Sequence, residues 1–158
     1  MQKTGTLPVL VILDNVRSMH NVGSVFRTGD AFLVEGICLC GYTPRPPHRD
    51  IQKTALGATD TVPWTYKESI KEAIEECKTA GRKVWAVEQV QGSLPLQDFA
   101  PTESIALVFG NEVEGVSKET LALCEGAVEI PQWGVKHSLN VSVAAGVVLW
   151  EIRKLHIP

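Results

Sequence analysis

The sequence lacks the long apolar runs that would carry a chain into or across a membrane. Its 158 residues are 44% hydrophobic, yet no stretch approaches the roughly 20 consecutive apolar residues that a membrane-spanning helix needs. Residues 1–5 also lack the apolar core of a secretory signal. We therefore expect a cytoplasmic protein without a membrane partner, folded as one domain over residues 1–158, a length that can bury a substantial core.

Cysteine is scarce, and its spacing excludes a metal site or a disulfide framework. The four cysteines lie in apolar or helical contexts, at Cys38, Cys40, Cys77 and Cys124. Their intervals match neither the ligand spacing of a zinc site nor that of a disulfide-rich domain. We therefore expect reduced, mostly buried thiols and no bound metal.

An excess of positive charge is also missing, since the formal net charge is -3. Neutralisation of phosphates by Lys and Arg provides most of the affinity for nucleic acid, so any RNA-binding surface must be a local patch. One candidate is the segment 44–49, which contains Arg45, His48 and Arg49, with His20 as a neighbour if the fold brings it near. A solvated loop stiffened by prolines is the alternative, and composition leaves both open.

Short, nearly unbroken apolar runs recur along the chain, at 9–13, 37–40, 84–87 and 105–109 and more weakly at 127–130. Such runs are typical of strands buried on both faces, as in a parallel sheet covered by helices. Segments with helical spacing lie between them. This order predicts an α/β fold with a mainly parallel sheet flanked by helices, whose ligands lie beyond the carboxyl ends of the strands.

Two of the intervening segments have the spacing of amphipathic helices. The first begins near Val22 with Asn21 as its N-cap, and its apolar stripe comprises Val25, Phe26, Phe32 and Leu33. The second spans 67–80 and ends at Gly81, and its apolar face comprises Ile70, Ala73, Ile74 and Cys77.

The last helix, expected from about Ser138 to about Leu155, is apolar almost all round. A surface helix normally has a polar face, and a chain this short has few elements that could cover every side of it. Small residues within 142–146 would let another backbone approach closely. We therefore predict a homodimer, and the alternative is a central helix buried within a monomer.

The segment 20–30 (HNVGSVFRTGD) is the first that can carry chemistry. On a helical wheel Arg27 lies opposite the apolar stripe, beside Gly23 and Ser24, which we interpret as room for a large ligand. An accessible guanidinium results. The alternative is a solvated arginine that pairs with Asp30, three residues further along the helix.

The segment 107–117 (LVFGNEVEGVS) is a strand that runs into a turn rich in glycine and carboxylate. The Lys-Ser/Thr of a P-loop is absent, and Glu112 and Glu114 would repel phosphate, which disfavours a mononucleotide phosphate site. Carboxylates at such a turn suit a ligand with cationic or hydroxyl groups. Ser117 can alternatively act only as the N-cap of a following helix.

The segment 130–142 (IPQWGVKHSLNVS) leads into the apolar helix. Ser138 has the position of an N-cap, and that role alone would account for it. Asn140 is harder to explain, because a lone amide in the first turn of an apolar helix needs hydrogen-bond partners.

Together these segments resemble the SpoU (TrmH) family of RNA ribose 2'-O-methyltransferases, in the SPOUT class. Asn21 to Arg27 resembles the family's Asn-x-x-x-x-x-Arg motif, 110–112 its Gly-Asn-Glu motif, and 130–141 its Ile-Pro-x-x-Gly-x-x-x-Ser-Leu-Asn-Val motif. The order and intervals make the likeness specific over most of the chain, although Val113 stands where many members have Gly. The resemblance implies an α/β-knot with a deep C-terminal trefoil knot.

The resemblance also implies an enzyme that uses S-adenosylmethionine to methylate a ribose 2'-hydroxyl. Its RNA is expected to be tRNA, with a D-loop guanosine as the finer suggestion, and rRNA is the alternative. Backbone groups of Gly110, Ile130 and Leu139 would hold the cofactor, which accounts for the lack of a Gly-x-Gly-x-x-Gly run after the first strand. RNA would contact the patch of His20, Arg45, His48 and Arg49.

The same resemblance implies that Arg27 is the catalytic arginine. It also implies polar supporting residues and further active-site residues, namely Asn21 and Glu112 as supports and Ser138 and Asn140 in the active site. A sulfonium methyl is already activated, so the protein must align the ribose oxygen and stabilise its developing charge. Because a guanidinium stays protonated at ordinary pH, we interpret Arg27 as an electrostatic stabiliser and not as a general base.

Two rival functions share this fold. A non-catalytic RNA-binding protein would be expected to have lost polar motif residues, and all of them are present. A SPOUT enzyme that methylates a base nitrogen is disfavoured by the motif from Asn21 to Arg27, which belongs to the ribose-modifying branch.

Overall fold

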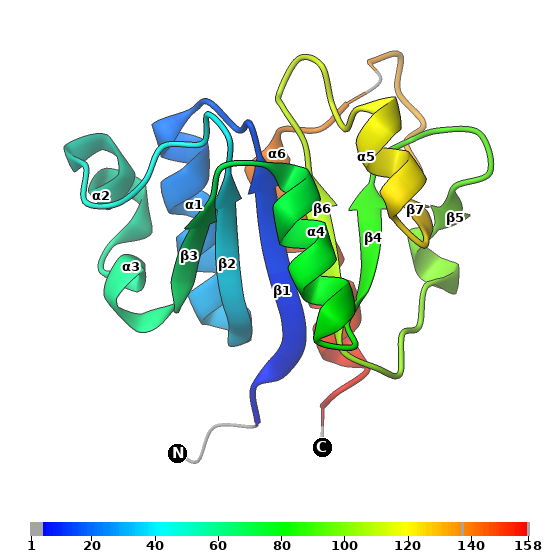
Figure 1. Cartoon of the computed structure of the whole chain (residues 1–158), viewed down its shortest axis with the longest axis horizontal. Helices are drawn as coiled ribbons and strands as arrows, with labels where there is room; N and C mark the ends of the chain where they lie inside the picture. The colour runs from blue at the N-terminus through cyan, green and yellow to red at the C-terminus, as the bar shows by residue number, and fades with distance from the viewer. Residues whose placement is uncertain (1–4, 137, 158) are drawn as a thin grey trace.

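The computed structural model describes residues 5–136 and 138–157 and shows a sheet with helices on both faces (Figure 1). Seven strands form the sheet in the order β3-β2-β1-β6-β4-β7-β5, and each pair of neighbouring strands is parallel. The predicted α/β fold with a mainly parallel sheet is confirmed.

The predicted apolar runs coincide with strands of this sheet, namely β1 (Leu7–Asp14), β2 (Val34–Cys40), β4 (Lys83–Val87), β6 (Ile105–Phe109) and β7 (Gly126–Glu129). The edge strands β3 (Trp64–Lys67) and β5 (Leu94–Pro95) were not predicted. Both are short and only partly buried, so they lack the unbroken apolar run that marks the inner strands.

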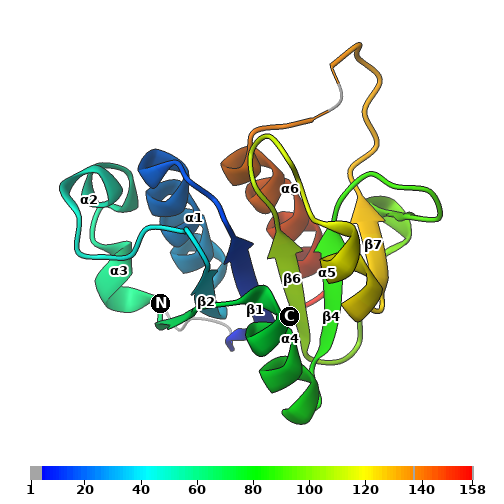
Figure 2. The ribbon, with the colours of Figure 1, turned by 45° about the horizontal axis from the view of Figure 1, so that its top comes forward.

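Helices α1 (Met19–Phe32) and α6 (Val141–Lys154) lie side by side behind the sheet, whereas α4 (Ile70–Thr79) and α5 (Lys118–Leu123) cover its front (Figures 1 and 2). Alternate side chains of each strand point to opposite faces. Val11 and Leu13 therefore pack in the core with α1 and α6, whereas Ile12 packs in a second core with α4. The short helices α2 (Arg49–Ala55) and α3 (Ala58–Thr61) pack outside α1, and the 3₁₀ turn η1 (Leu96–Asp98) packs near α6.

Helix α1 begins earlier than predicted. Its N-cap is Ser18, whose hydroxyl accepts a hydrogen bond from the backbone N–H of Asn21 at 3.2 Å. The prediction that Asn21 is the cap is therefore wrong. Both residue types can cap, but Ser18 has the extended backbone of a cap residue, and Asn21 lies inside the first turn with its amide directed elsewhere.

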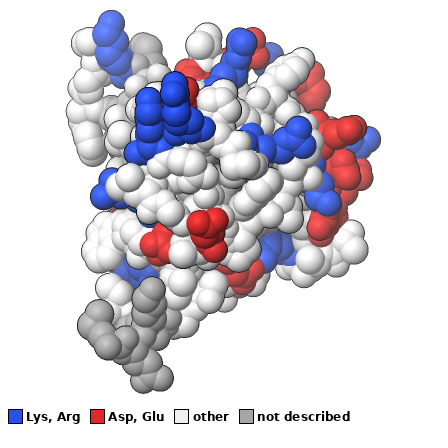
Figure 3. All heavy atoms as spheres, turned by 90° about the vertical axis from the view of Figure 1, so that its left-hand side faces the viewer, with Lys and Arg blue, Asp and Glu red and all other residues white. Residues whose placement is uncertain are grey.

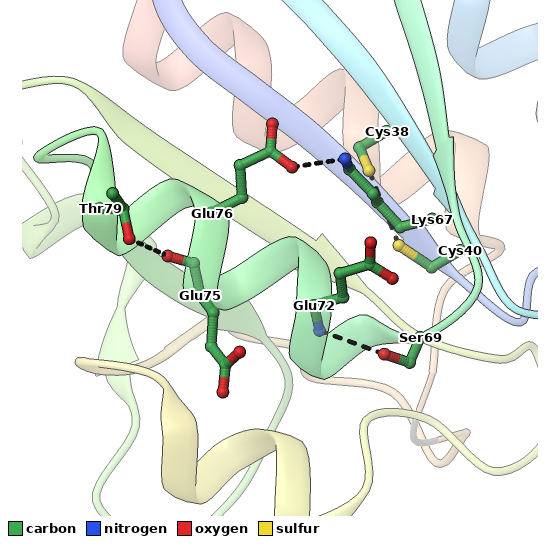
Figure 4. A network of polar contacts seen from close by, with 8 residues as sticks. All are labelled: Cys38, Cys40, Lys67, Ser69, Glu72, Glu75, Glu76 and Thr79. Carbon is green, nitrogen blue, oxygen red and sulfur yellow. Dashed lines mark hydrogen bonds and ion pairs between the residues drawn. The ribbon is translucent and has the colours of Figure 1, made fainter.

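Helix α4 begins later than predicted. Residues 64–67 form β3, and Ser69 is the N-cap that accepts a hydrogen bond from the N–H of Glu72 at 3.2 Å. The predicted start at Lys67 is wrong, since that residue pairs with Cys40 in the sheet. Lys67 then reaches Glu76 on α4, which ties the edge strand to the helix above it (Figure 4).

Helix α6 begins at Val141, and its N-cap is Asn140 and not Ser138. The side-chain oxygen of Asn140 accepts hydrogen bonds from the N–H of Ser142 at 2.9 Å and from its hydroxyl at 2.6 Å. This cap explains how the lone amide is satisfied. Ser138 belongs to the preceding loop, so its predicted capping role is wrong.

The four cysteines are free thiols, three of them buried, which confirms the expectation of reduced, mostly buried thiols. Cys38 and Cys40 project from the same face of β2 beneath α4, with their sulfur atoms 3.7 Å apart (Figure 4). Burial raises the pKa of the Cys77 thiol and raises that of Cys124 to about 11. Among the described residues, no group of three or more His, Cys, Asp or Glu side chains is placed to hold a metal ion, and no described helix is long and apolar enough to span a membrane.

Candidate active site

A cavity of about 920 Å³ opens beyond the carboxyl ends of β4, β6 and β7. Its walls come from the loop after β4, from the turn after β6, and from the loop that joins β7 to α6. Parallel α/β sheets bind their ligands at this end of the strands, and the volume is within the usual range of small-molecule sites. We call this space the cofactor cavity.

The turn after β6 is tightly closed by its own residues. The side-chain oxygen of Asn111 accepts hydrogen bonds from the N–H groups of Val113 at 2.8 Å and Glu114 at 3.0 Å. A Cβ atom on Gly110 would lie 2.4 Å from the carbonyl of Gly115. Gly110 is therefore required for this close approach, and its backbone remains open to the cavity.

Glu88 is a site residue that sequence reasoning missed. It follows β4, lines the cofactor cavity, and accepts a hydrogen bond from the N–H of Val116 at 2.9 Å. This bond joins the loop after β4 to the turn after β6. The only signal in the sequence is a carboxylate directly after an apolar run, which is too common to identify a site.

Glu112 connects the turn after β6 to the start of α1. Its carboxylate accepts hydrogen bonds from the N–H groups of Arg17 at 3.0 Å and Ser18 at 2.9 Å, and from the amide of Asn21 at 3.4 Å. Partial burial acts to raise the pKa of the Glu112 carboxyl, but these hydrogen bonds outweigh it and hold the pKa below its ordinary value. The first two sequence motifs therefore meet in space.

The third motif forms a further wall of the cofactor cavity. Ile130, Ser138, Leu139 and Asn140 all line it, together with Gly110 and Glu112, while His137 of the same motif lies outside the described residues. The structure therefore brings six of the residues named from the motifs to one space, from segments about 20 to 30 residues apart in sequence.

Arg27 does not join this group within one chain. It is exposed on α1 and is absent from the described lining of the cofactor cavity. Among the described ion pairs none joins Arg27 to Asp30, whose carboxylate instead accepts a hydrogen bond from the Thr61 hydroxyl at 2.7 Å.

The interpretation of Gly23 as room for a ligand is wrong. A Cβ atom there would lie 2.0 Å from the hydroxyl oxygen of Thr54 and 2.3 Å from the carbonyl oxygen of Ile51. Both belong to α2. The glycine instead lets α2 pack directly against α1.

The basic patch proposed from the sequence lies around α2 and the loop before it. His48 caps α2 by accepting a hydrogen bond from the N–H of Asp50 at 3.1 Å, and Arg49 is exposed in the first turn of the helix. The guanidinium of Arg45 lies 4.1 Å from the centre of the Tyr66 ring, and His20 is exposed at the start of α1. Figure 3 shows Lys and Arg side chains gathered mainly in the upper half of this side of the molecule, with acidic side chains along the right-hand edge of the view.

A model of the SpoU rRNA methylase family matches residues 8–150 of the chain. The chain belongs to this family. Among its SpoU relatives, the 23S rRNA (guanosine-2'-O-)-methyltransferase RlmB of Neisseria meningitidis is 33% identical over 151 residues, which cover 95% of this chain and 60% of the relative. RlmB of Bordetella pertussis is 35% identical over 144 residues, covering 90% and 58%. The chain thus spans about 60% of the length of these relatives.

Solved structures of SpoU proteins share this architecture. The TrmH/SpoU tRNA modifying enzyme of A. aeolicus matches with a TM-score of 0.87 and 27% identity, over 97% of this chain and 77% of that one. The AdoMet-bound rRNA methyltransferase of Sinorhizobium meliloti matches with a TM-score of 0.88 and 28% identity, over 99% and 63%. A structure described as giving insight into the 2-OH methylation of C/U34 on tRNA matches with a TM-score of 0.83 and 26% identity, over 93% of this chain and 95% of that one. The fold is therefore that of the SPOUT methyltransferases.

Proposed function

We propose that this chain transfers the methyl group of S-adenosylmethionine to a ribose 2'-hydroxyl of structured RNA. The observation that carries the proposal is the cofactor cavity, because it collects Gly110, Ile130 and Leu139 with Glu112, Ser138 and Asn140. Similarity to the AdoMet-bound protein of Sinorhizobium meliloti supports the same cofactor.

The residues of the cavity fit S-adenosylmethionine chemically. Apolar side chains of Val87, Phe109 and Leu121 can cover the adenine ring, while Glu88 and Glu129 suit hydroxyl and ammonium groups. Backbone groups of Gly110, Ile130 and Leu139 would hold the ring edge and the ribose. When bound, the cofactor supplies an already activated methyl group, so the protein has only to exclude water and position the acceptor oxygen.

We assign the stabilisation of the acceptor oxygen to Arg27, whose fixed positive charge offsets the negative charge that develops during transfer. Asn21 and Glu112 support it by fixing the start of α1 against the turn after β6. Ser138 and Asn140 border the same space. The contacts of Glu112 support this arrangement, since they join the two motifs.

A homodimer would complete this site. On α6 the side chains of Val143, Val147 and Trp150 are 51%, 38% and 46% exposed, so an apolar strip faces solvent beside α1. Since α6 begins at the cofactor cavity with Asn140, we propose that a second copy packed on this strip would bring the partner subunit's Arg27 towards the cavity. Twofold packing of this kind covers the same surface on both chains.

For the substrate we favour tRNA, with rRNA as the alternative. Similarity to the protein whose structure is described with the 2-OH methylation of C/U34 on tRNA supports this preference, whereas the RlmB relatives are named for guanosine in 23S rRNA. The patch of His20, Arg45, His48 and Arg49 would contact the RNA backbone. The deep C-terminal trefoil knot belongs to the same proposal and stays a prediction.

Nucleoside mass spectrometry tests the proposed function. The protein is incubated with S-adenosylmethionine and bulk RNA from cells that lack it, and the RNA is digested to nucleosides. We expect a new 2'-O-methyl nucleoside, found in the tRNA fraction. A base-methylated nucleoside or no product would contradict the proposal, and a product confined to rRNA would overturn only the preference for tRNA.

A further inference from the structure

A second cavity, of about 620 Å³, opens beside the cofactor cavity at the carboxyl ends of β1, β2 and β3. Asn111, Glu114 and Gly115 line both spaces, so the turn after β6 is a shared wall. The other walls come from Asp14 and Asn15, from the tyrosines Tyr42 and Tyr66, and from the starts of α4 and α5. The proposed methyl transfer assigns no role to this space, which we call the tyrosine cavity.

Tyr42 presents an aromatic ring to solvent from a fixed backbone. The residue is 81% exposed, yet its N–H donates a hydrogen bond to the side-chain oxygen of Asn15 at 2.8 Å. Gly41 before it has φ +62, and a Cβ atom there would lie 2.1 Å from the same oxygen. A large aromatic side chain held in this way can stack on a flat ligand with little loss of backbone freedom.

Tyr66 and Arg45 extend this surface. The Tyr66 hydroxyl donates a hydrogen bond to the carbonyl of Gly41 at 2.9 Å, and the Arg45 guanidinium lies 4.1 Å from the Tyr66 ring centre. Stacking on the ring holds the Arg45 charge beside Tyr66, which lines the cavity. Aromatic rings next to a placed arginine are the combination with which proteins bind unpaired nucleotides.

The interior of the tyrosine cavity favours a base over a phosphate. Asp14 lies half-buried in its wall, and its carboxylate accepts no hydrogen bond from the part of the chain that the structure describes, while burial raises its pKa. Glu68 and Glu114 are further carboxylates at the rim. These groups repel phosphate but accept hydrogen bonds from N–H groups on the edge of a base, and guanine offers two such donors, at N1 and N2, to one carboxylate.

We propose that the tyrosine cavity receives an unpaired guanine of the substrate RNA, stacked on Tyr42 and hydrogen-bonded to Asp14, with Arg45 on the adjoining phosphate. The inference rests on the proposed function, because the ligand is the RNA of that reaction. Since the shared wall separates the base from the cofactor cavity, the guanine is a neighbour of the modified nucleotide. The cavity therefore sets which sequence is methylated and takes no part in the transfer itself.

The first test separates stacking from folding and from catalysis. A fluorescently labelled tRNA stem–loop is titrated by anisotropy with the wild-type chain and with Tyr42→Ala, Tyr42→Phe and Ile157→Ala. Ile157 is a matched exposed apolar residue near the C-terminus, outside the described linings of both cavities. We expect Tyr42→Ala to weaken RNA binding by about 10-fold or more, as loss of a stacking partner does, and the other variants to bind as the wild type does.

Calorimetry with S-adenosylmethionine accompanies the titration, and all these variants should bind the cofactor equally. RNA binding by Tyr42→Ala at wild-type strength, or equal weakening in Tyr42→Phe, would overturn the stacking role. A wild-type chain that binds no RNA would overturn it too. A chain that binds RNA and cofactor but forms no methylated product contradicts only the proposed function, because the comparison of Tyr42 variants still decides this inference.

The second test addresses the identity of the base. Each unpaired guanine of the stem–loop is replaced in turn by inosine, which lacks the N2 amino group. At one position we expect inosine to weaken binding to the wild type several-fold and to leave binding to Asp14→Ala unchanged, because alanine has no acceptor for the N2 amino group. Equal inosine effects in both proteins would overturn the Asp14 contact. Binding of spermidine at the carboxylates would also overturn it, if the heat of spermidine binding is lost in Asp14→Ala while that variant still binds guanine more strongly than inosine.

Discussion

At the scale of single residues, Glu112 contributes to stability as well as to the site. Its carboxylate accepts hydrogen bonds from two backbone N–H groups and from Asn21, and these bonds are strongest with the ionised form. The folded chain therefore holds the Glu112 pKa below the ordinary value of 4.5. The unfolded state binds the proton more readily, so stability increases with pH in this region.

This linkage gives a direct prediction for stability. The contribution of Glu112 is complete above about pH 4.5 and is lost as the pH falls through the lower pKa of the folded state. Urea unfolding followed between pH 3 and pH 6 should show a steeper loss of stability in the wild type than in Glu112→Gln. The control Glu125→Gln removes an exposed carboxylate from outside the site and should keep the wild-type slope. Parallel curves for the wild type and Glu112→Gln would show that these hydrogen bonds do not favour the ionised carboxylate.

Substitutions of Arg27 test whether its positive charge stabilises the acceptor oxygen. Arg27→Lys retains the positive charge and should retain measurable methyl transfer, whereas Arg27→Ala should lose about 100- to 1,000-fold in the rate constant of transfer. Cofactor affinity should not change, because Arg27 does not line the described part of its own cofactor cavity. The measurement is single-turnover transfer to RNA with saturating S-adenosylmethionine. Equal losses in both variants would count against simple charge stabilisation.

The site could be predicted in part from single residues. Gly110, Ile130 and Leu139 were placed in one cavity because their motifs are specific. Glu88 was missed because a carboxylate after a strand is common. The N-cap of α6 was predicted at Ser138 and is Asn140, since both residue types make good caps and only the backbone geometry decides between them.

At the scale of elements, the packing of α2 on α1 depends on one glycine. A Cβ atom at Gly23 would overlap the hydroxyl of Thr54 and the carbonyl of Ile51. A Cβ atom at Gly146 in α6 would meet only the Thr28 methyl, at an ordinary 3.9 Å. Gly23 and Gly146 therefore differ in what surrounds them.

Substitution by alanine should separate them. Gly23→Ala should lower the free energy of unfolding by about 1–3 kcal/mol, because the overpacked helices must move apart. Gly146→Ala should leave it unchanged or raise it by up to about 1 kcal/mol, through better helix propensity. Urea denaturation at pH 7 measures both. A Gly23→Ala protein as stable as the wild type would mean that α2 can shift without loss.

Elements were predictable where one physical signal dominated. The inner strands were found because burial on both faces leaves continuous apolar runs. The edge strand β3 was not predicted, and its last residue, Lys67, was assigned to the start of the following helix, because it runs without a break into the amphipathic pattern of α4. The start of α4 depends on the cap at Ser69. The prediction followed the spacing of the apolar side chains and did not use this cap.

At the scale of the whole molecule, the apolar strip of α6 predicts the oligomeric state. Val147→Glu places a charge in the middle of the strip formed with Val143 and Trp150. We expect a wild-type dimer and a Val147→Glu monomer in sedimentation velocity, with transfer activity lost and cofactor binding kept. The control Ala122→Glu lies on α5, at the opposite face of the sheet, and should remain dimeric. A monomeric wild type with full activity would contradict the dimer.

The account as a whole depends on the cofactor cavity, and isothermal titration of the purified chain with S-adenosylmethionine tests it most directly. We predict saturable binding of one cofactor per chain, with competition by S-adenosylhomocysteine at the same stoichiometry. A chain that is folded by circular dichroism yet gives no saturable heat and no competition would contradict the central claim.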